Sequence, residues 1–306
     1  MKYFIIAGEA SGDLHGSTLV TALLKQDSNA EIIGMGGPKM AEAGVHCVVD
    51  YSNYSFMGFI EIVANLRKIK GLFTKIKAEI DAFKPNKVIL VDYGGFNLKI
   101  AKYCKEKGIQ THFYILPKVW AWNEKRVVKI KQFVDVGYCI FPFEEKYFRE
   151  RGVNAHYVGN PVVEQIDTYL KSNAGSRQEY VALLPGSRKQ EIERILPTLL
   201  NFAGHRSDLT FKIAAHGASL FKGYSIPSNV ELSTDNTYTT VRQAKAAIVT
   251  SGTANLETAL LDTPQVVCYK ANPVSYFLGK RLVKIKYISP VNLILDKLVI
   301  RELIQG

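Results

Sequence analysis

The chain has 306 residues, 47% of them hydrophobic and 22% charged, which is ordinary for a soluble enzyme of two α/β domains. No apolar stretch approaches the length of a membrane-spanning helix, and the run at 4–7 is too short for a signal peptide, which argues against spanning and secreted proteins. The formal net charge of +11 leaves nucleic acid, an anionic membrane surface and phosphorylated substrates as partners.

The cysteines are scattered and form no C-x-x-C pair: Cys47, Cys104, Cys139 and Cys268. Three of them stand in apolar runs, which predicts buried, reduced thiols and a cytoplasmic protein. No His and Cys cluster has the spacing of a metal site, so no metal is expected.

Short apolar runs alternate with amphipathic stretches along the chain, which is the pattern of βα units and parallel sheets. The polar stretch 169–180 is interpreted as a linker between two doubly wound domains, residues 1–168 and 169–306, with a ligand cleft between them. Ligands of such sheets bind beyond the carboxyl ends of the strands. The predicted strands are Tyr3–Ala7, Glu31–Met35, Lys87–Val91, Thr111–Leu116, Val136–Phe141, His156–Val158, Val181–Leu184, Phe211–Ala215, Ala246–Thr250 and Gln265–Tyr269.

The first strand runs into GEASGDLHG, whose glycines at Gly8, Gly12 and Gly16 do not match the dinucleotide fingerprint G-x-G-x-x-G. Ser11, Gly12 and Asp13 fall at the start of the next helix, where free amides and the helix dipole favour an anion or a hydroxyl-rich ligand. The alternative is an N-capped helix behind a tight turn.

Asp92 directly follows the strand Lys87–Val91 and precedes Gly94 and Gly95. A carboxylate at the carboxyl end of a strand is well placed as a general base, and desolvation there would raise its pKa toward the working range. Alternatively, Asp92 caps the next helix or a turn, which is a common role of Asp.

Two loops of the second half have the composition of phosphate-binding loops. Arg188 follows a strand and a Pro-Gly turn, and its planar guanidinium matches a phosphate bidentately. The small residues of 251–254 let phosphate oxygens approach backbone amides, and Glu257 lies one turn later, within reach of ribose hydroxyls. The loops predict a nucleotide diphosphate site; a capped helix with Glu257 near its own dipole is the alternative.

From 56 to 83, apolar residues recur near the helical period with Arg and Lys interleaved. This is either a basic amphipathic helix in an anionic membrane interface or a core-packing helix with a solvated basic face. The stretch VWAWNEKRVVKIK at 119–131 adds two Trp beside further basic residues, which suits an interface or a sugar-stacking floor.

Together these motifs resemble the lipid A disaccharide synthase family, bacterial glycosyltransferases that join two acylated glucosamines. The matching stretches, in family order, are AGEASGDLHG, GGPKM, MGFIEI, DYGGFN, VWAWNEKRVVKIK, FPFE, LLPGSRKQEI, SGTANLETAL and KRLVKIKYIS followed by NLI. The resemblance implies a GT-B fold of two Rossmann-like domains, with the donor nucleotide mainly on the C-terminal half. It implies an enzyme on the cytoplasmic face of the inner membrane that needs no cofactor, metal or nucleic acid; a homodimer is left open.

The implied reaction joins UDP-2,3-diacylglucosamine to 2,3-diacylglucosamine 1-phosphate with inversion, giving a β(1→6)-linked disaccharide 1-phosphate and UDP. Asp92 falls on the family's essential aspartate and is the implied general base, acting on the acceptor's 6-hydroxyl. The implied UDP site comprises Ser187, Arg188, Ser251, Gly252, Thr253, Ala254, Glu257 and Asn292. The implied acceptor cleft comprises Glu9, Ser11, Gly12, Asp13, His15 and Asn97. The implied membrane-facing patch comprises Phe59, Ile62, Val63, Leu66, Arg67, Ile69 and Phe73.

The chain departs from the family pattern in three places. Gly94 stands where the family usually has Pro, which predicts a looser Asp92 loop; residues 116–118 read Leu-Pro-Lys where it has Ser-Pro-Gln; and Asn160 replaces a His. Family members also continue for several tens of residues, in a tail that packs across the N-terminal domain of GT-B enzymes, so a truncated chain is expected.

Three other readings stay open. Another UDP-sugar enzyme of this architecture, such as the transferase of lipid II synthesis or a UDP-N-acetylglucosamine 2-epimerase, would lack the GEASGDLHG and VWAWNEKR stretches. A non-catalytic UDP-sugar or lipid-binding protein would tolerate loss of Asp92. A nucleic-acid binder is the weakest, because no recognised nucleic-acid motif is present.

Overall fold

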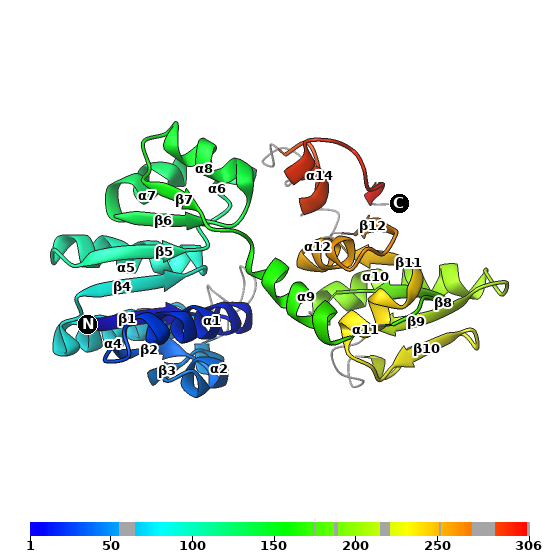
Figure 1. The fold of residues 1–306 in the computed structure, drawn as a ribbon, viewed down its shortest axis with the longest axis horizontal. Helices are drawn as coiled ribbons and strands as arrows, with labels where there is room; N and C mark the ends of the chain where they lie inside the picture. The colour runs from blue at the N-terminus through cyan, green and yellow to red at the C-terminus, as the bar shows by residue number, and fades with distance from the viewer. Residues whose placement is uncertain are drawn as a thin grey trace. The chain divides into compact units, whose positions relative to one another are not determined.

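The computed structural model describes residues 1–54, 65–173, 175–186, 189–214, 221–250, 252–270 and 285–304. It divides into two compact domains, Met1–Gly159 and Asn160–Gly306, each built on one parallel sheet with helices packed on it (Figure 1). The predicted α/β class of two Rossmann-like domains is confirmed.

The division between the domains lies earlier than the predicted boundary after residue 168. Helix α9 (Pro161–Ser172) buries Val162 and Ile166 in the core of the second domain, so it belongs there. The predicted linker 169–180 is wrong, because it is largely the end of α9 and the start of β8 (Gln178–Leu184).

The first domain has a seven-stranded sheet in the order β3-β2-β1-β4-β5-β6-β7, with every pair parallel. The strand order reverses between β1 and β4, so the loops after these two strands meet at a topological switch point, where such sheets bind ligands. The strands are β1 (Lys2–Ala7), β2 (Glu31–Gly36), β3 (His46–Asp50), β4 (Lys87–Val91), β5 (Gln110–Tyr114), β6 (Val136–Cys139) and β7 (Ala155–Tyr157).

Helices cover both faces of this sheet because its central strands are apolar on both sides. On β1, Phe4 and Ile6 enter one core cluster, and Tyr3, Ile5 and Ala7 enter the other. The helices are α1 (Ala10–Gln26), α2 (Pro38–Glu42), η1 (Tyr51–Tyr54), α4 (Leu66–Phe83), α5 (Gly94–Glu106), α6 (Val119–Trp122), η2 (Glu124–Arg126), α7 (Val127–Phe133) and α8 (Pro142–Arg149).

The second domain repeats this plan with a six-stranded parallel sheet in the order β10-β9-β8-β11-β12-β13. Its switch point lies between β8 and β11. Besides β8, its strands are β9 (Thr210–Ala214), β10 (Val230–Ser233), β11 (Ala244–Thr250), β12 (Gln265–Tyr269) and β13 (Glu302–Ile304). Its described helices other than α9 are α10 (Lys189–Gly204), α11 (Thr237–Arg242), α12 (Thr253–Leu260) and α14 (Pro290–Leu295).

The described C-terminal segment, 285–304, joins this sheet through β13, which pairs with β12, and polar contacts within the segment hold its own parts together. Glu302 accepts hydrogen bonds from the backbone N–H groups of Ile288 and Ser289, at 3.0 and 2.9 Å, and from the side-chain amide of Asn292 at 2.9 Å. Asn292 is fully buried, and its side-chain oxygen accepts from the N–H groups of Val299 and Ile300. No apolar side chain of this described segment is buried.

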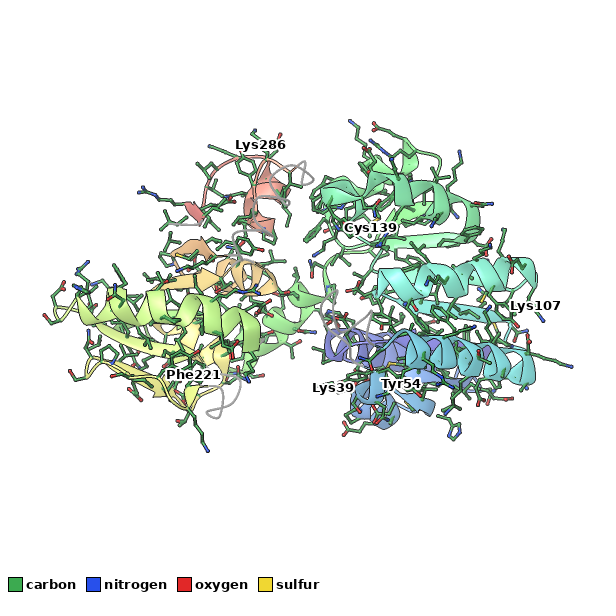
Figure 2. The ribbon with its side chains drawn as sticks, turned by 180° about the vertical axis from the view of Figure 1, so that it is seen from behind. Lys39, Tyr54, Lys107, Cys139, Phe221 and Lys286 are labelled. Atoms are coloured by element: carbon green, nitrogen blue, oxygen red, sulfur yellow. The ribbon has the colours of Figure 1, made fainter. Side chains whose placement is uncertain are left out.

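Every predicted strand is present, with small differences at the ends. The sequence does not predict β3, β10 and β13, which are short edge strands with little apolar alternation. All four cysteines are free, and burial raises the pKa of Cys104 and of Cys139 to about 12. Charged side chains such as Lys107 and Lys286 lie at the surface of their domains (Figure 2). Among the described residues, no helix has both the length and the apolar character needed to cross a membrane.

Candidate functional site

Asp92 lies at the switch point of the first sheet, directly after the register pair Ala7 and Val91 of β1 and β4. Asp92 and Tyr93 have φ values of +46° and +48°, in the left-handed region that costs a residue other than glycine about 1–3 kcal/mol. The surrounding structure holds this conformation. The Asp92 N–H donates to the Tyr114 carbonyl at 2.9 Å, and the Asn97 side-chain amide donates to the Asp92 carbonyl at 2.8 Å.

The Asp92 side chain is partly exposed, and the pKa of its carboxyl is raised. Burial raises its pKa, while the charge of Lys118 and a hydrogen bond from the Tyr93 N–H act in the opposite direction. An ionised carboxylate of raised pKa is a stronger base than that of an ordinary Asp. This strained, accessible carboxylate at a switch point suits proton abstraction from a bound hydroxyl.

Gly8 ties the loop after β1 to the Asp92 loop, although it is not among the site residues predicted from the sequence. A Cβ built at Gly8 would lie 2.3 Å from Cδ1 of the Tyr93 ring, so no other residue fits without moving that ring. Glu9 follows, and its charge adds to burial in raising the pKa of the Tyr93 hydroxyl. A glycine immediately after a strand was the available signal, and its partner could not be known from the sequence.

The predicted acceptor residues differ in exposure to solvent. Ser11 is exposed in the first turn of α1, beside Glu9. Asp13 is 1% exposed, and its carboxylate accepts from the N–H groups of Gly37, Lys39 and Met40 at 2.7, 3.1 and 3.1 Å, so it caps α2.

Three more of these residues are largely covered by protein. Asn97 is fully buried beneath the Asp92 loop, where its side-chain oxygen has no hydrogen-bond partner. Burial lowers the pKa of His15. Gly12 is buried, and a Cβ there would lie 3.3 Å from the Ala7 Cβ. In this structure Asn97 supports the Asp92 loop and Gly12 packs against β1, while a role of these residues in the acceptor cleft stays a prediction.

Two departures from the family pattern have a structural reason. A Cβ at Gly94 would lie 2.7 Å from Cγ of Pro117, so that ring fills the space beside the Asp92 loop. With the hydrogen bonds described above, this packing fixes the loop, contrary to the expected looseness. Asn160 is the N-cap of α9, and its side-chain oxygen accepts from the Val162 N–H at 3.1 Å.

The switch point of the second domain carries the described part of the predicted nucleotide site. Thr250 donates its hydroxyl to the Leu184 carbonyl at 2.9 Å, which joins the ends of β11 and β8. Gly252 follows with φ +136°, and exposed Thr253 and partly exposed Ala254 form the first turn of α12. The amides of that turn and the helix dipole suit an anionic ligand. Ser187, Arg188 and Ser251 lie outside the described residues.

Glu257 and Asn292, the remaining predicted UDP residues, differ in accessibility. Burial raises the pKa of Glu257, which accepts a hydrogen bond from the Tyr238 hydroxyl at 3.4 Å. Asn292 is fully buried in its contacts with the C-terminal segment, so in this structure it is a stabilising residue.

The predicted membrane patch is described only in part. Phe59, Ile62 and Val63 lie outside the described residues, as does the side chain of Leu66. On α4, Arg67 is exposed, Ile69 is partly buried, and Phe73 stacks on Phe96 with ring centroids 4.1 Å apart. The stripe Leu72, Ile76 and Ile80 is buried in the core, so this part of the helix packs on the sheet with a solvated basic face. Across the described ranges, no group of three or more His, Cys, Asp and Glu side chains could hold a metal ion.

Comparison with known proteins identifies the family. A model of the lipid-A-disaccharide synthetase family matches residues 3–306. The chain belongs to the lipid-A-disaccharide synthase family. A lipid-A-disaccharide synthase of Syntrophus aciditrophicus is 38% identical over 99% of this chain and 83% of its own length, and one of Myxococcus xanthus is 36% identical over 100% and 84%.

Solved structures resemble this family member in fold alone. The UDP-GlcNAc 2-epimerase of Neisseria meningitidis, bound to UDP-GlcNAc, has a TM-score of 0.61 at 13% identity, covering 97% of this chain and 90% of its own. The glycotransferase of kitacinnamycin has a TM-score of 0.63 at 14% identity, covering 99% and 86%. Both an epimerase and a transferase match, so the fold does not choose between them, whereas the sequence family does.

Proposed function

We propose that this member of the lipid-A-disaccharide synthase family transfers 2,3-diacylglucosamine from its UDP conjugate to the 6-hydroxyl of 2,3-diacylglucosamine 1-phosphate. The products are a β(1→6)-linked disaccharide 1-phosphate and UDP. Support comes from the family match over residues 3–306 and from the position of Asp92 at a switch point. The mechanism rests on one observation at Asp92: its partly exposed carboxyl has a raised pKa, and hydrogen bonds hold its backbone in the left-handed region.

In the proposed step, the Asp92 carboxylate takes the proton of the acceptor's 6-hydroxyl as that oxygen forms a bond to the anomeric carbon of the donor. The bond from this carbon to the UDP oxygen breaks, and its electron pair leaves with the diphosphate. Attack opposite to the leaving group inverts the anomeric centre. The amides at the start of α12, at Thr253 and Ala254, stabilise the charge that develops on the diphosphate.

The test is disaccharide formation in detergent micelles by the parent chain, by Asp92→Asn and by Asp167→Asn, which removes an exposed carboxylate of α9. Asp92→Asn is expected to lose about 10²–10⁴-fold in kcat, the usual contribution of a general base, and to keep UDP binding. Asp167→Asn is expected to match the parent. Equal rates in all three would remove Asp92 from the mechanism, and UDP binding without turnover by the parent would favour a binding protein.

Acylated substrates lie in a membrane, so we also propose that the enzyme works at the anionic cytoplasmic surface of the inner membrane. The exposed Arg67, Lys68 and Lys70 of α4 support this, because such side chains are attracted to anionic lipid. Flotation with phosphatidylglycerol vesicles should show binding that weakens as salt rises and that falls in a variant with these three residues changed to Ala. Binding indifferent to salt and to the variant would contradict it.

A further inference from the structure

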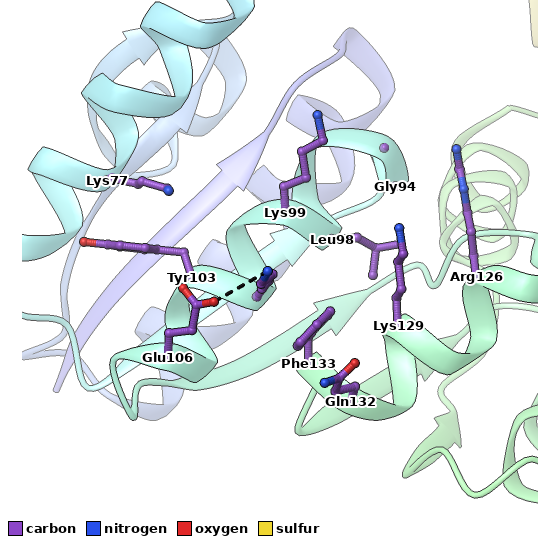
Figure 3. A pocket seen from close by; sticks show the side chains of 12 residues that line it. Lys77, Gly94, Leu98, Lys99, Tyr103, Glu106, Arg126, Lys129, Gln132 and Phe133 are labelled. Atoms are coloured by element: carbon purple, nitrogen blue, oxygen red, sulfur yellow. Dashed lines mark ion pairs between the residues drawn. The ribbon is translucent and has the colours of Figure 1, made fainter.

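A groove of about 520 Å³ runs along α5 in the first domain, between α4 on one side and η2 with α7 on the other (Figure 3). It begins at Gly94 and Gly95, at the N-terminus of α5, and ends near Tyr103 and Gln132. Neither the family match nor the residues predicted for the acceptor, UDP or membrane account for it.

The cations of the groove are distributed unevenly. At the far end, Lys102 pairs with Glu106 at 3.7 Å (dashed line in Figure 3). Lys77 lies near Asp81, whose pKa is lowered mainly by a hydrogen bond from the Tyr103 hydroxyl and to a smaller extent by the charge of Lys77. Glu106 is the one acidic residue among the described residues that line the groove, so the end near Gly94 has no anion in its lining.

Three cations remain at that end: Lys99, Arg126 and Lys129. Figure 3 shows their side chains extended toward the end where Gly94 lies. The Lys99 ammonium stands 5.1 Å from the Phe73 ring centroid, and the Arg126 guanidinium 4.9 Å from the Trp122 ring. These aromatic contacts hold a cation in place without neutralising its charge.

The backbone at this end adds hydrogen-bond donors. The N–H groups of Gly94 and Gly95 are in the first turn of α5, where no carbonyl of the same helix can accept from them. Gly95 is exposed, and nothing lies within 4 Å of a Cβ built there, so a ligand oxygen can approach its amide. Three cations and a helix N-terminus together match a doubly charged oxyanion.

We propose that this end of the groove, formed by Gly94, Gly95, Lys99, Arg126 and Lys129, binds a phosphate monoester. Resting on the proposed function, the phosphate is the anomeric phosphate of the acceptor sugar.

The chain distance to Asp92 fits this assignment. Gly94 is two residues beyond Asp92, a span of at most about 7 Å. In the acceptor, the carbon bearing the phosphate and the carbon bearing the 6-hydroxymethyl group both adjoin the ring oxygen. A phosphate held at Gly94 therefore keeps the reacting hydroxyl near the carboxylate.

The first experiment measures kcat/KM for two acceptors, 2,3-diacylglucosamine 1-phosphate and the same sugar without phosphate. The proteins are the parent, Arg126→Ala/Lys129→Ala, and the charge-matched control Lys125→Ala/Lys131→Ala, two exposed lysines that do not line the groove. Each lost charge-assisted hydrogen bond is worth roughly tenfold or more, so the groove variant should lose about 10²-fold on the phosphorylated acceptor, mainly through KM. It should lose less than about 2-fold on the other acceptor, and the control should match the parent on both. Equal losses on both acceptors, or none on either, would overturn the proposal.

A second experiment separates this site from the proposed function and from other sources of phosphate. Calorimetry with α-glucosamine 1-phosphate should give binding to the parent and none to the groove variant, and glucosamine should not bind to either. If the parent binds this probe through the groove but makes no disaccharide, the proposed function falls and the phosphate site stands. Two results would overturn the acceptor assignment: inorganic phosphate binding as tightly as the sugar phosphate, or a groove variant that has lost binding to phosphatidylglycerol vesicles but still binds the sugar phosphate.

Discussion

Asp13 and Asp92 come after neighbouring parallel strands of one sheet, Asp92 directly after β4 and Asp13 in the first turn of the helix after β1, yet their carboxylates have opposite surroundings. Asp13 is buried and accepts three hydrogen bonds from the backbone at the start of α2. Asp92 is partly exposed, has a left-handed backbone and receives a hydrogen bond from the neighbouring Tyr93 N–H. An acid after a strand is therefore not enough to identify a base: what matters is whether its lone pairs are already used by the protein.

The sharpest test of this contrast is Asp13→Ala, which leaves three N–H groups without their acceptor. We expect the free energy of unfolding to fall by about 2–4 kcal/mol, measured by urea denaturation, while the activity per folded molecule is kept. Asp167→Ala is the control. If Asp13→Ala loses activity at unchanged stability, Asp13 belongs to the acceptor site and does not differ from Asp92 in the way described.

A second test moves the Asp92 loop through its neighbour. In Gly8→Ala the new methyl group displaces the Tyr93 ring, so we expect kcat/KM to fall about 10–100-fold, because small misplacements of a catalytic group are costly. Gly71→Ala, at an open position on α4, should be silent. If Gly8→Ala keeps full activity, the position of Tyr93 does not matter to the reaction.

A third test concerns stability and pH. The pKa of Asp92 is raised in the folded state, so its ionisation opposes folding above the ordinary value of 3.8, and fully so above the raised value. Asp92→Asn should therefore be more stable than the parent at pH 7, and the difference should vanish as the pH falls below 3.8. Thermal unfolding across this range measures it. A less stable variant at pH 7 would mean that the carboxylate supports the fold, as at Asp13.

The smallest expected effect is that of Lys118→Gln. The charge of Lys118 lowers the pKa of Asp92, so its removal should raise that pKa and move the acidic limb of the kcat/KM profile to higher pH. The loss of rate should be greatest below the midpoint and absent well above it. Lys125→Gln serves as the control, and an unchanged limb would show that Lys118 does not act on the base.

The sequence could predict positions along the chain better than it could predict surroundings. The apolar run before Asp92 was enough to place that residue at the end of a strand, because parallel strands buried on both faces are nearly continuous in apolar residues. Its strain and raised pKa come from Tyr114, Asn97 and Lys118, which no local pattern joins to it.

The role of Asp13 in capping α2 could not be predicted from the sequence for the same reason. Its hydrogen-bond partners lie 24 to 27 residues further along the chain, at the start of a helix of five residues. Asn292 shows the same limit, because a family motif gave its position but not its burial among polar contacts. Edge strands such as β13 were missed because only one neighbour and few apolar residues define them.

The polar contacts between Glu302 of β13 and residues 288–292 have a consequence for how the second domain opens. Hydrogen bonds between polar groups are worth little net free energy each, and the described segment buries no apolar side chain that would make its detachment costly. Local opening of such a unit takes less free energy than unfolding of the sheet. In deuterated water, the amide hydrogens of Ile288 and Ser289 should thus exchange before those of β8 and β11, because this segment opens before the centre of the sheet.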